Sequence, residues 1–248
     1  MTSEMVLSHV SAGVLHQLPS WESTLERVTV LRLSGGHGSR RRNLHVRLSP
    51  VAPVEITEID GYPVTRLERT AIDLGCLHDY DRAVAVMDAA LHLKASFDIM
   101  ADTVEAARAR RGVATARAAL SFADGRSESV GESISRVRMA AAGLPAPQLQ
   151  VNVFDEFGTW LARTDFGWEM LGVLGEFDGR IKYVGTSDQV ARTVMLEKDR
   201  EDRLRELGWA VVRWKWADLA DLDGFRRRIE AAIAQANPSA IRGFIQPS

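Results

Sequence analysis

The order in which hydrophobic patterns change along the second half of the chain constrains its fold more than any other feature. Apolar residues recur with helical spacing, then alternate as in strands, then return to helical spacing. The expected segments are a helix at 127–143, strands at 149–154, 159–167 and 171–177, a helix at 187–207, a strand at 210–214 and a last helix. This αβββαβα order predicts helices packed on a sheet, and so an α/β (α+β) fold class.

The first half has its own, smaller α+β pattern. We expect helices at 6–18, 65–75, 80–94 and 98–120, and strands at 27–33, 44–48 and 54–59. Thr65 and Glu68 have the spacing of a capping box, after a turn at 60–63. The sequence Asp-Gly-Arg-Ser at 124–127 interrupts the helical region, which predicts a domain boundary near residue 124 and domains at 1–123 and 124–248.

Composition narrows the possible classes of protein. The 248 residues carry a net charge of −2, which neither favours nor excludes nucleic acid as a partner. A single cysteine, Cys76, excludes an intrachain disulfide, a CxxC redox pair and a thiolate zinc cluster, and so favours the cytoplasm. No apolar run approaches the roughly 20 residues that span a bilayer, so we expect no membrane partner. The segment after Ala236 is expected to be loosely held.

Three carboxylates are expected to converge at one edge of the second sheet. Glu176 and Asp178 are two positions apart, and a hairpin brings Asp165 onto the neighbouring strand. Glu132, near the start of the preceding helix, is a candidate fourth member. Clustered oxygen ligands suit Mg²⁺ or Mn²⁺. The alternative is that the acids only mark a strand running into a turn.

Basic residues follow this acidic cluster. Lys182 is a candidate for orienting or deprotonating an attacking water, or else a solvated loop lysine. Arg200, Arg203 and Arg213 are candidates for contacts with nucleic-acid phosphates, although most charges on this helix fit i,i+4 pairs on a solvated face. Trp214 and Trp216 are expected to pack in the core rather than to stack on bases.

The run from Ser127 to Trp216 resembles the PD-(D/E)XK nuclease superfamily, in the branch similar to very-short-patch repair endonucleases. The motifs that carry the resemblance are SESVGES at 127–133, RTDFGW at 163–168, VLGEFDGRIKY at 173–183 and EKDREDRLRELGWAVVRWKW at 197–216. The resemblance implies a restriction-endonuclease-like αβββαβ core, with Asp165, Glu176 and Glu132 as metal ligands. Asp178 stands where the superfamily usually has a lysine, and Lys182 where these relatives often have a histidine, so the general base stays open.

The first domain resembles the body of AbiEi-type antitoxins without their winged helix. The matching segments are SHVSAGVLHQLP at 8–19 and GYPVTRLERTAIDLGC at 61–76. Ser8, His9 and His16 do not suggest a nucleophile, because no acid nearby in the sequence would orient the histidines. The basic, Gly-rich segment 34–42 is either a phosphate contact or a flexible hairpin loop.

These observations predict a Mg²⁺-dependent endodeoxyribonuclease. Its catalytic set is Asp165, Glu176, Asp178, Lys182 and Glu132, and DNA is its partner. The resemblances imply a role in DNA repair or in defence against phages and mobile elements, with a toxin or repair protein as a second partner. The alternative is a non-catalytic antitoxin or transcriptional regulator that uses the nuclease fold to bind DNA or a toxin.

Overall fold

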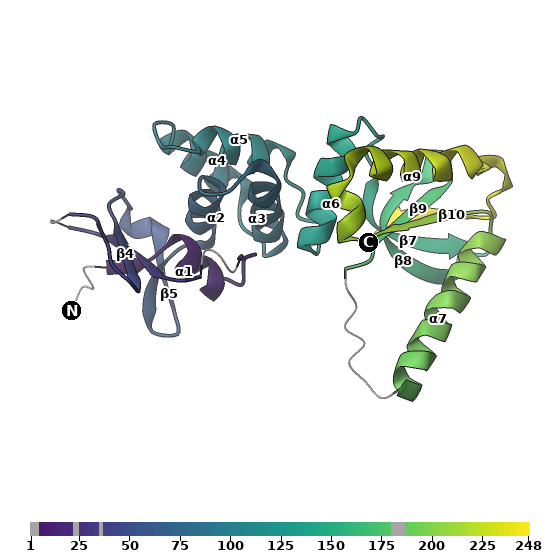
Figure 1. Cartoon of the computed structure of the whole chain (residues 1–248), viewed down its shortest axis with the longest axis horizontal. Coiled ribbons are helices and arrows are strands. Elements are labelled where there is room, and N and C mark those ends of the chain that lie inside the picture. Colours follow the sequence, from purple (N-terminus) through teal and green to yellow (C-terminus); the bar gives the residue numbers. More distant parts are fainter. Residues whose placement is uncertain (1–4, 22–24, 35–36, 180–186) are drawn as a thin grey trace. The chain divides into compact units, whose positions relative to one another are not determined.

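The computed structural model describes residues 5–21, 25–34, 37–179 and 187–248; for 187–194, 196 and 197 it describes the helical backbone alone. Contacts divide the chain into two compact units, Met1–Ser133 and Ile134–Ser248. Each unit combines a sheet with helices (Figure 1), which confirms the expected α+β class. The boundary expected near residue 124 falls in the loop before a helix, whereas the division by contacts falls inside that helix.

The first unit contains a mixed sheet with strand order β3-β4-β2-β1-β6-β5. Its strands are β1 Met5–Leu7, β2 Val28–Arg32, β3 Ser39–Arg40, β4 Leu44–Arg47, β5 Ile56–Ile59 and β6 Tyr62–Thr65. Asp60 and Gly61, both with positive φ, form the two-residue turn that joins β5 to β6. The turn was expected, but the strand that follows it was not.

Helices complete the first unit. They are α1 His9–Leu15, α2 Leu67–Gly75, α3 Tyr80–His92, α4 Phe97–Ala106 and α5 Val113–Phe122, with a 3₁₀ turn, η2, at Pro53–Glu55. Helix α2 is buried along most of its length, and α3 presents a run of buried small and apolar residues from Ala83 to Met87. The core of this unit therefore lies among α2 and its neighbouring helices.

Two helix predictions in this unit were wrong in extent. Residues 6–18 form strand β1 before helix α1, because Val6 is buried in register with Leu31 of β2. Residues 98–120 form two helices, since Gly112 adopts φ +84° and its missing side chain leaves room for the backbone of Cys76.

The predicted capping box was also wrong. Thr65 ends strand β6, and Arg66 occupies the N-cap of α2 without a side-chain hydrogen bond. Glu68 instead accepts a hydrogen bond from the backbone N–H of Ser96, while the Thr65 hydroxyl lies 2.8 Å from that of Thr70. Thr65 pairs with Ile56 of β5 and therefore belongs to strand β6 rather than to the N-cap of the helix.

The second unit follows the predicted order of elements, and adds two 3₁₀ turns, a second C-terminal helix and a last strand. Its elements are α6 Val130–Ala141, which begins in the first unit, β7 Gln148–Asp155, β8 Trp160–Trp168, η3 Glu169–Leu171, β9 Val173–Phe177, α7 Ser187–Glu206, β10 Ala210–Trp214, α8 Trp216–Ala220, α9 Leu222–Gln235, η4 Pro238–Ala240 and β11 Gly243–Pro247. The sheet order is β10-β9-β8-β7-β11. Strands β7, β8 and β9 are consecutive and antiparallel, whereas β10 runs parallel to β9.

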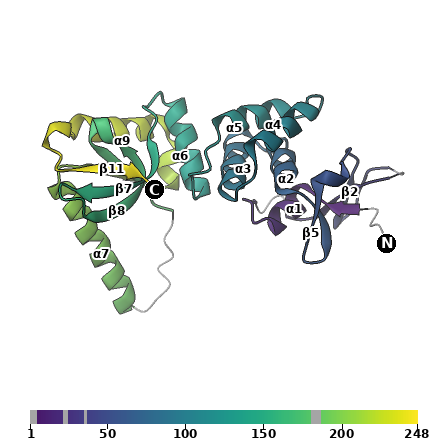
Figure 2. The same cartoon turned by 180° about the vertical axis from the view of Figure 1, so that it is seen from behind.

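Both faces of this sheet carry a hydrophobic core. One cluster includes Val173, Trp214 and Ile229 of α9, and the other includes Leu174 and Leu204 of α7. Neighbouring residues of one strand thus enter different clusters, as the alternation of side chains in a strand requires. Helices α9 and α7 cover the opposite faces (Figures 1 and 2).

The surroundings of Trp214, Trp216 and the C-terminal segment were also predicted from the sequence. Trp214 is buried, as predicted, and its indole N–H donates to the Ser135 hydroxyl at 2.7 Å. Trp216 is 43% exposed, which contradicts a core position; its ring packs edge-on against Phe177. The segment after Ala236 is not loose, because β11 pairs with β7 and buries Ile245.

No helix in the described part of the chain is both long and apolar enough to cross a membrane.

Candidate functional site

Asp165 and Glu176 come from facing strands of the second sheet. The antiparallel register pairs Phe166 with Gly175, so the next position outward on each strand holds one of the two acids. The Asp165 carboxylate accepts a hydrogen bond from the backbone N–H of Phe177 at 2.8 Å. This bond holds the Asp165 side chain over the carboxyl end of β9, beside the backbone of Glu176.

Two arginines hold the Glu176 carboxylate. Arg200 of α7 approaches one oxygen at 2.7 Å, and Arg213 of β10 approaches the other at 2.9 Å. The parallel register of β9 and β10 places Arg213 directly opposite Glu176. Arg213 also lies 3.2 Å from a carboxylate oxygen of Glu201. The Glu176 side chain is only 13% exposed, so these arginines offset the cost of removing its charge from water.

The other predicted site residues have different positions. Asp178 is exposed, and its backbone N–H donates to the carbonyl oxygen of Trp214 at 2.7 Å, which extends the pairing of β9 with β10. Arg203 is exposed on α7. Lys182 lies outside the described residues.

Glu132 lies in the first turn of α6 and belongs to the first unit. Its carboxylate accepts hydrogen bonds from the Ser129 hydroxyl at 2.7 Å and from the backbone N–H of Glu128 at 2.9 Å. The Ser129 hydroxyl oxygen in turn accepts from the Glu132 backbone N–H at 3.2 Å. These reciprocal bonds give Glu132 a helix-capping role in the structure.

Two of the predicted metal ligands, Asp165 and Glu176, lie on facing strands. In the described part of the chain, no group of three or more His, Cys, Asp and Glu side chains is arranged to hold a metal ion. Mg²⁺, however, is commonly held by one or two carboxylates, with water and substrate phosphate completing its octahedron. Asp165 and Glu176 have the donor chemistry and the strand positions for that role.

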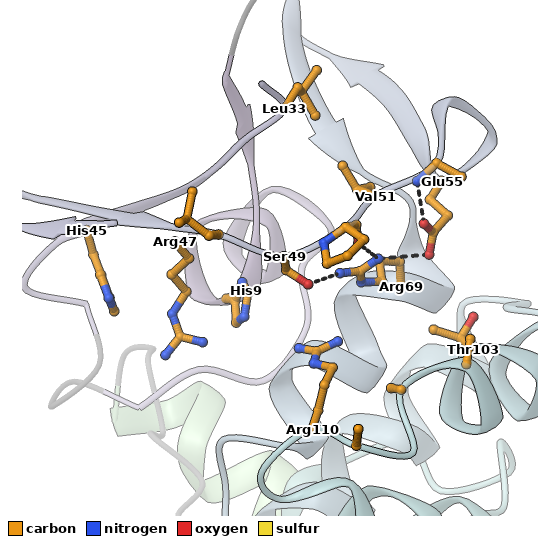
Figure 3. A pocket seen from close by; sticks show the side chains of 16 residues that line it. His9, Leu33, His45, Arg47, Ser49, Val51, Glu55, Arg69, Thr103 and Arg110 are labelled. Atoms are coloured by element: carbon orange, nitrogen blue, oxygen red, sulfur yellow. Dashed lines mark hydrogen bonds and ion pairs between the residues drawn. The ribbon is translucent and has the colours of Figure 1, made fainter. Parts of the chain in front are cut away.

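The first unit contains a second cluster of charged residues, around the fully buried Asp73 of α2 (Figure 3 shows its arginines). One Asp73 oxygen accepts from Arg69 at 3.0 Å and from Arg110 at 2.6 Å. Arg69 also donates to Glu55 at 2.9 Å and to the Ser49 hydroxyl at 3.0 Å. Burial alone would raise the pKa of Asp73, but the positive charge of His9 when protonated, Arg69 and Arg110 lowers it below its ordinary value.

His9 lies beside this cluster and is also buried. Its Nδ1 is 3.0 Å from the Ser8 hydroxyl and 3.7 Å from the second oxygen of Asp73. Because serine and aspartate approach the same ring nitrogen, the three residues cannot form a nucleophile–base–acid relay. Burial lowers the pKa of His9 from 6.5 to about 4, so the ring is neutral at pH 7.

The Asp73 cluster was not predicted from the sequence. The i,i+4 spacing of Arg69 and Asp73 was visible, but on a helix it is typical of an exposed ion pair. Ala71, Ile72 and Leu74 are the signal that this ion pair is buried rather than exposed, because they form an apolar run around Asp73. The His16 ring has its Nε2 2.8 Å from the carbonyl oxygen of Thr65.

Comparison with known proteins supplies relatives without a described activity. No family model matches the chain, and no solved structure matches it. Over 158 residues it is 32% identical to the uncharacterized protein MT2308 of Mycobacterium tuberculosis (strain CDC 1551 / Oshkosh) and to the uncharacterized protein Rv2248 of strain ATCC 25618 / H37Rv. The match covers 63% of this chain and 56% of each relative, so the chain spans about half the length of the curated relatives it matches.

Proposed function

We propose that the second unit is a Mg²⁺-dependent nuclease of the PD-(D/E)XK type that hydrolyses phosphodiester bonds in DNA. One observation carries the proposal: Asp165 and Glu176 lie on facing strands, with Asp165 held at the end of β9 by the backbone of Phe177. The αβββαβ order, three antiparallel strands followed by a parallel fourth, supports a restriction-endonuclease-like core.

In this proposal Asp165 and Glu176 hold the cation. A bound Mg²⁺ supplies an activated water and stabilises negative charge on the phosphate. Arg200 and Arg213 orient the Glu176 carboxylate, and their charge lies where a DNA phosphate would approach the acids. Asp178, Lys182 and Glu132 stay candidate members of the site, and Arg203 a candidate phosphate contact.

The resemblances seen in the sequence extend the proposal to biology. We assign the chain to the cytoplasm, to DNA repair or to defence against phages and mobile elements, with a toxin or repair protein as a second partner. The single cysteine supports the compartment, and the AbiEi-like motifs of the first unit support the toxin partner.

The test is cleavage of supercoiled plasmid, circular single-stranded DNA and RNA by the full chain in Mg²⁺, Mn²⁺ or EDTA. Asp165→Asn and Glu176→Gln should each lower metal-dependent cleavage of DNA by about two orders of magnitude or more, because each removes a charged ligand. Asp223→Asn and Glu230→Gln, on the exposed surface of α9, are the matched controls and should cleave like the unmodified chain. Undiminished cleavage by either site variant would overturn the assignment.

A second function has one observation in its favour. Both oxygens of Glu176 already engage arginines, an arrangement that also suits a nuclease fold kept only for binding DNA or a toxin. This alternative predicts that the chain shifts a DNA duplex equally well in Mg²⁺ and in EDTA, and that it cuts no substrate. A duplex that is cut in Mg²⁺ and spared in EDTA would exclude it.

A further inference from the structure

The first unit contains a large cavity that the proposed nuclease does not use. Its volume is about 980 Å³, and it opens between the end of β4, the following loop and the loop between α4 and α5 (Figure 3). Its polar lining comes from His9, His45, Arg47, Ser49, Glu55, Arg69, Thr103 and Arg110. Drug-sized and cofactor-sized ligands occupy cavities of about 300 to 1,000 Å³, so this one is large enough for a small organic molecule.

The three arginines of the cavity differ in how many hydrogen bonds and ion pairs their guanidinium groups form. Arg69 donates four hydrogen bonds, to Asp73, Glu55, Ser49 and the carbonyl oxygen of Pro50. Arg110 donates to Asp73 and is partly exposed. Arg47 forms no hydrogen bond or ion pair with any residue that the structure describes, and its guanidinium is directed into the cavity (Figure 3). Among these three arginines, Arg47 therefore has the charge that is most available to a ligand, and Arg110 comes next.

Positive charge exceeds negative charge around Arg47. Asp73 pairs with Arg69 and Arg110, Glu55 pairs with Arg69, and His9 is neutral at pH 7. A smaller adjoining cavity of about 230 Å³ shares His9, His45 and Arg47 and adds Arg27 and Arg40, with Glu26 as its acid. Burial and the charges of nearby arginines lower the pKa of both Arg47 and His45, although the pKa of Arg47 is partly restored by Asp73.

The rest of the cavity wall is apolar. Leu33, Leu48 and Val51 line one part of it, and Ala106, Ala107 and Ala109 line another. Concave sites that combine an apolar wall with a few fixed polar groups bind small molecules rather than flat partners. An arginine fork beside such a wall matches a phosphate group attached to an organic body.

We propose that this cavity binds a small organic phosphate, with Arg47 and Arg110 holding the phosphate group and the apolar wall holding its organic part. The proposal does not rest on the nuclease assignment. Ser49 also lines this cavity, and its hydroxyl is a further polar group for the phosphate to contact.

The test is isothermal titration of the full chain with inorganic phosphate and with phenyl phosphate, in EDTA and at constant ionic strength set by NaCl. The Asp165→Asn variant serves as the background, so that the proposed nuclease site stays without metal. We expect saturable binding of both probes, tighter for phenyl phosphate. Arg47→Gln should weaken it by about tenfold or more, the effect of losing one charge-assisted contact.

Arg117→Gln is the matched control, since Arg117 is an exposed arginine of α5 that lines neither cavity; it should bind like the background. A second readout needs no substitution in the cavity: phenyl phosphate should slow amide hydrogen exchange in residues 47–52 and 106–110. Equal affinities of the Arg47→Gln and background chains, or no exchange protection at saturating probe, would overturn the proposal. Arg47-dependent binding of a DNA dodecamer without binding of phenyl phosphate would also overturn it, in favour of a nucleic-acid surface.

Discussion

The two units use the same components, a carboxylate between two arginines, in different surroundings. Asp73 in the first unit is 0% exposed, and its partners Arg69 and Arg110 bind one of its oxygens. Glu176 in the second unit is 13% exposed, and its arginines are each about one-third exposed. The first cluster joins α2 to the loop after α4, whereas the second is partly exposed to solvent. Burial therefore separates a cluster that stabilises the fold from one that is available for chemistry.

The largest effect that this comparison predicts is on stability, from Asp73→Asn. Removing one partner of a buried ion pair leaves charge uncompensated and typically costs about 3 to 5 kcal/mol. Chemical denaturation should show a loss of this size for the first unit. Asp98→Asn, at an exposed position of α4, should change stability by less than about 0.5 kcal/mol. If Asp73→Asn were as mild as Asp98→Asn, the cluster would not be what stabilises this unit.

The second effect is on the stability of the first unit, which should depend on pH. His9 has a pKa of about 4 in the folded chain and 6.5 when unfolded, so the unfolded chain binds the extra proton between these values. The contribution of neutral His9 to the free energy of unfolding is complete above pH 6.5. It is lost as the pH falls toward 4, by about 3 kcal/mol at most. The lowered pKa of Asp73 acts in the same direction at still lower pH.

Hydrogen exchange of the α2 amides at pH 7 and pH 5, corrected for the intrinsic exchange rate, measures this loss locally. His9→Gln should flatten the dependence, because glutamine does not titrate. A chain whose α2 protection is the same at both pH values would show that His9 does not couple protons to folding.

The smallest effect is on the stability of the second unit. Glu176→Gln removes two ion pairs whose arginines are already partly solvated, so the free energy of unfolding should fall by only about 1 kcal/mol. The same substitution should abolish cleavage, and this contrast marks a functional cluster. A loss of several kcal/mol, measured by urea titration, would place Glu176 with Asp73 among the residues that stabilise the fold.

Helices and strands could be predicted from the sequence where neighbouring residues determine them, and not where a distant strand does. The elements of the second unit from α6 to β10 were predicted because their hydrophobic period changes sharply. The first segment was misassigned because Val6 fits both a helical stripe and a strand, and only its pairing with β2 decides. Strand β11 was missed because its partner, β7, lies far away in the sequence.

The candidate site shows the same limit. The acids Asp165 and Glu176 were identified from hairpin spacing, which is local. The pairing of Glu176 with Arg213 depends on the register of the parallel strands β9 and β10, which joins residues separated by a long helix. The Asp73 cluster draws its partners from α2, η2 and the α4–α5 loop, and no spacing in the sequence encodes that meeting.

Cleavage of supercoiled plasmid by the unmodified chain and by Asp165→Asn, at equal folded concentration, is the most direct test of the central claim. We expect cutting by the unmodified chain that requires Mg²⁺ or Mn²⁺ and stops in EDTA, and almost no cutting by the variant. Equal cutting by both chains, or no cutting by the unmodified chain with either metal on any nucleic acid tested, would contradict it.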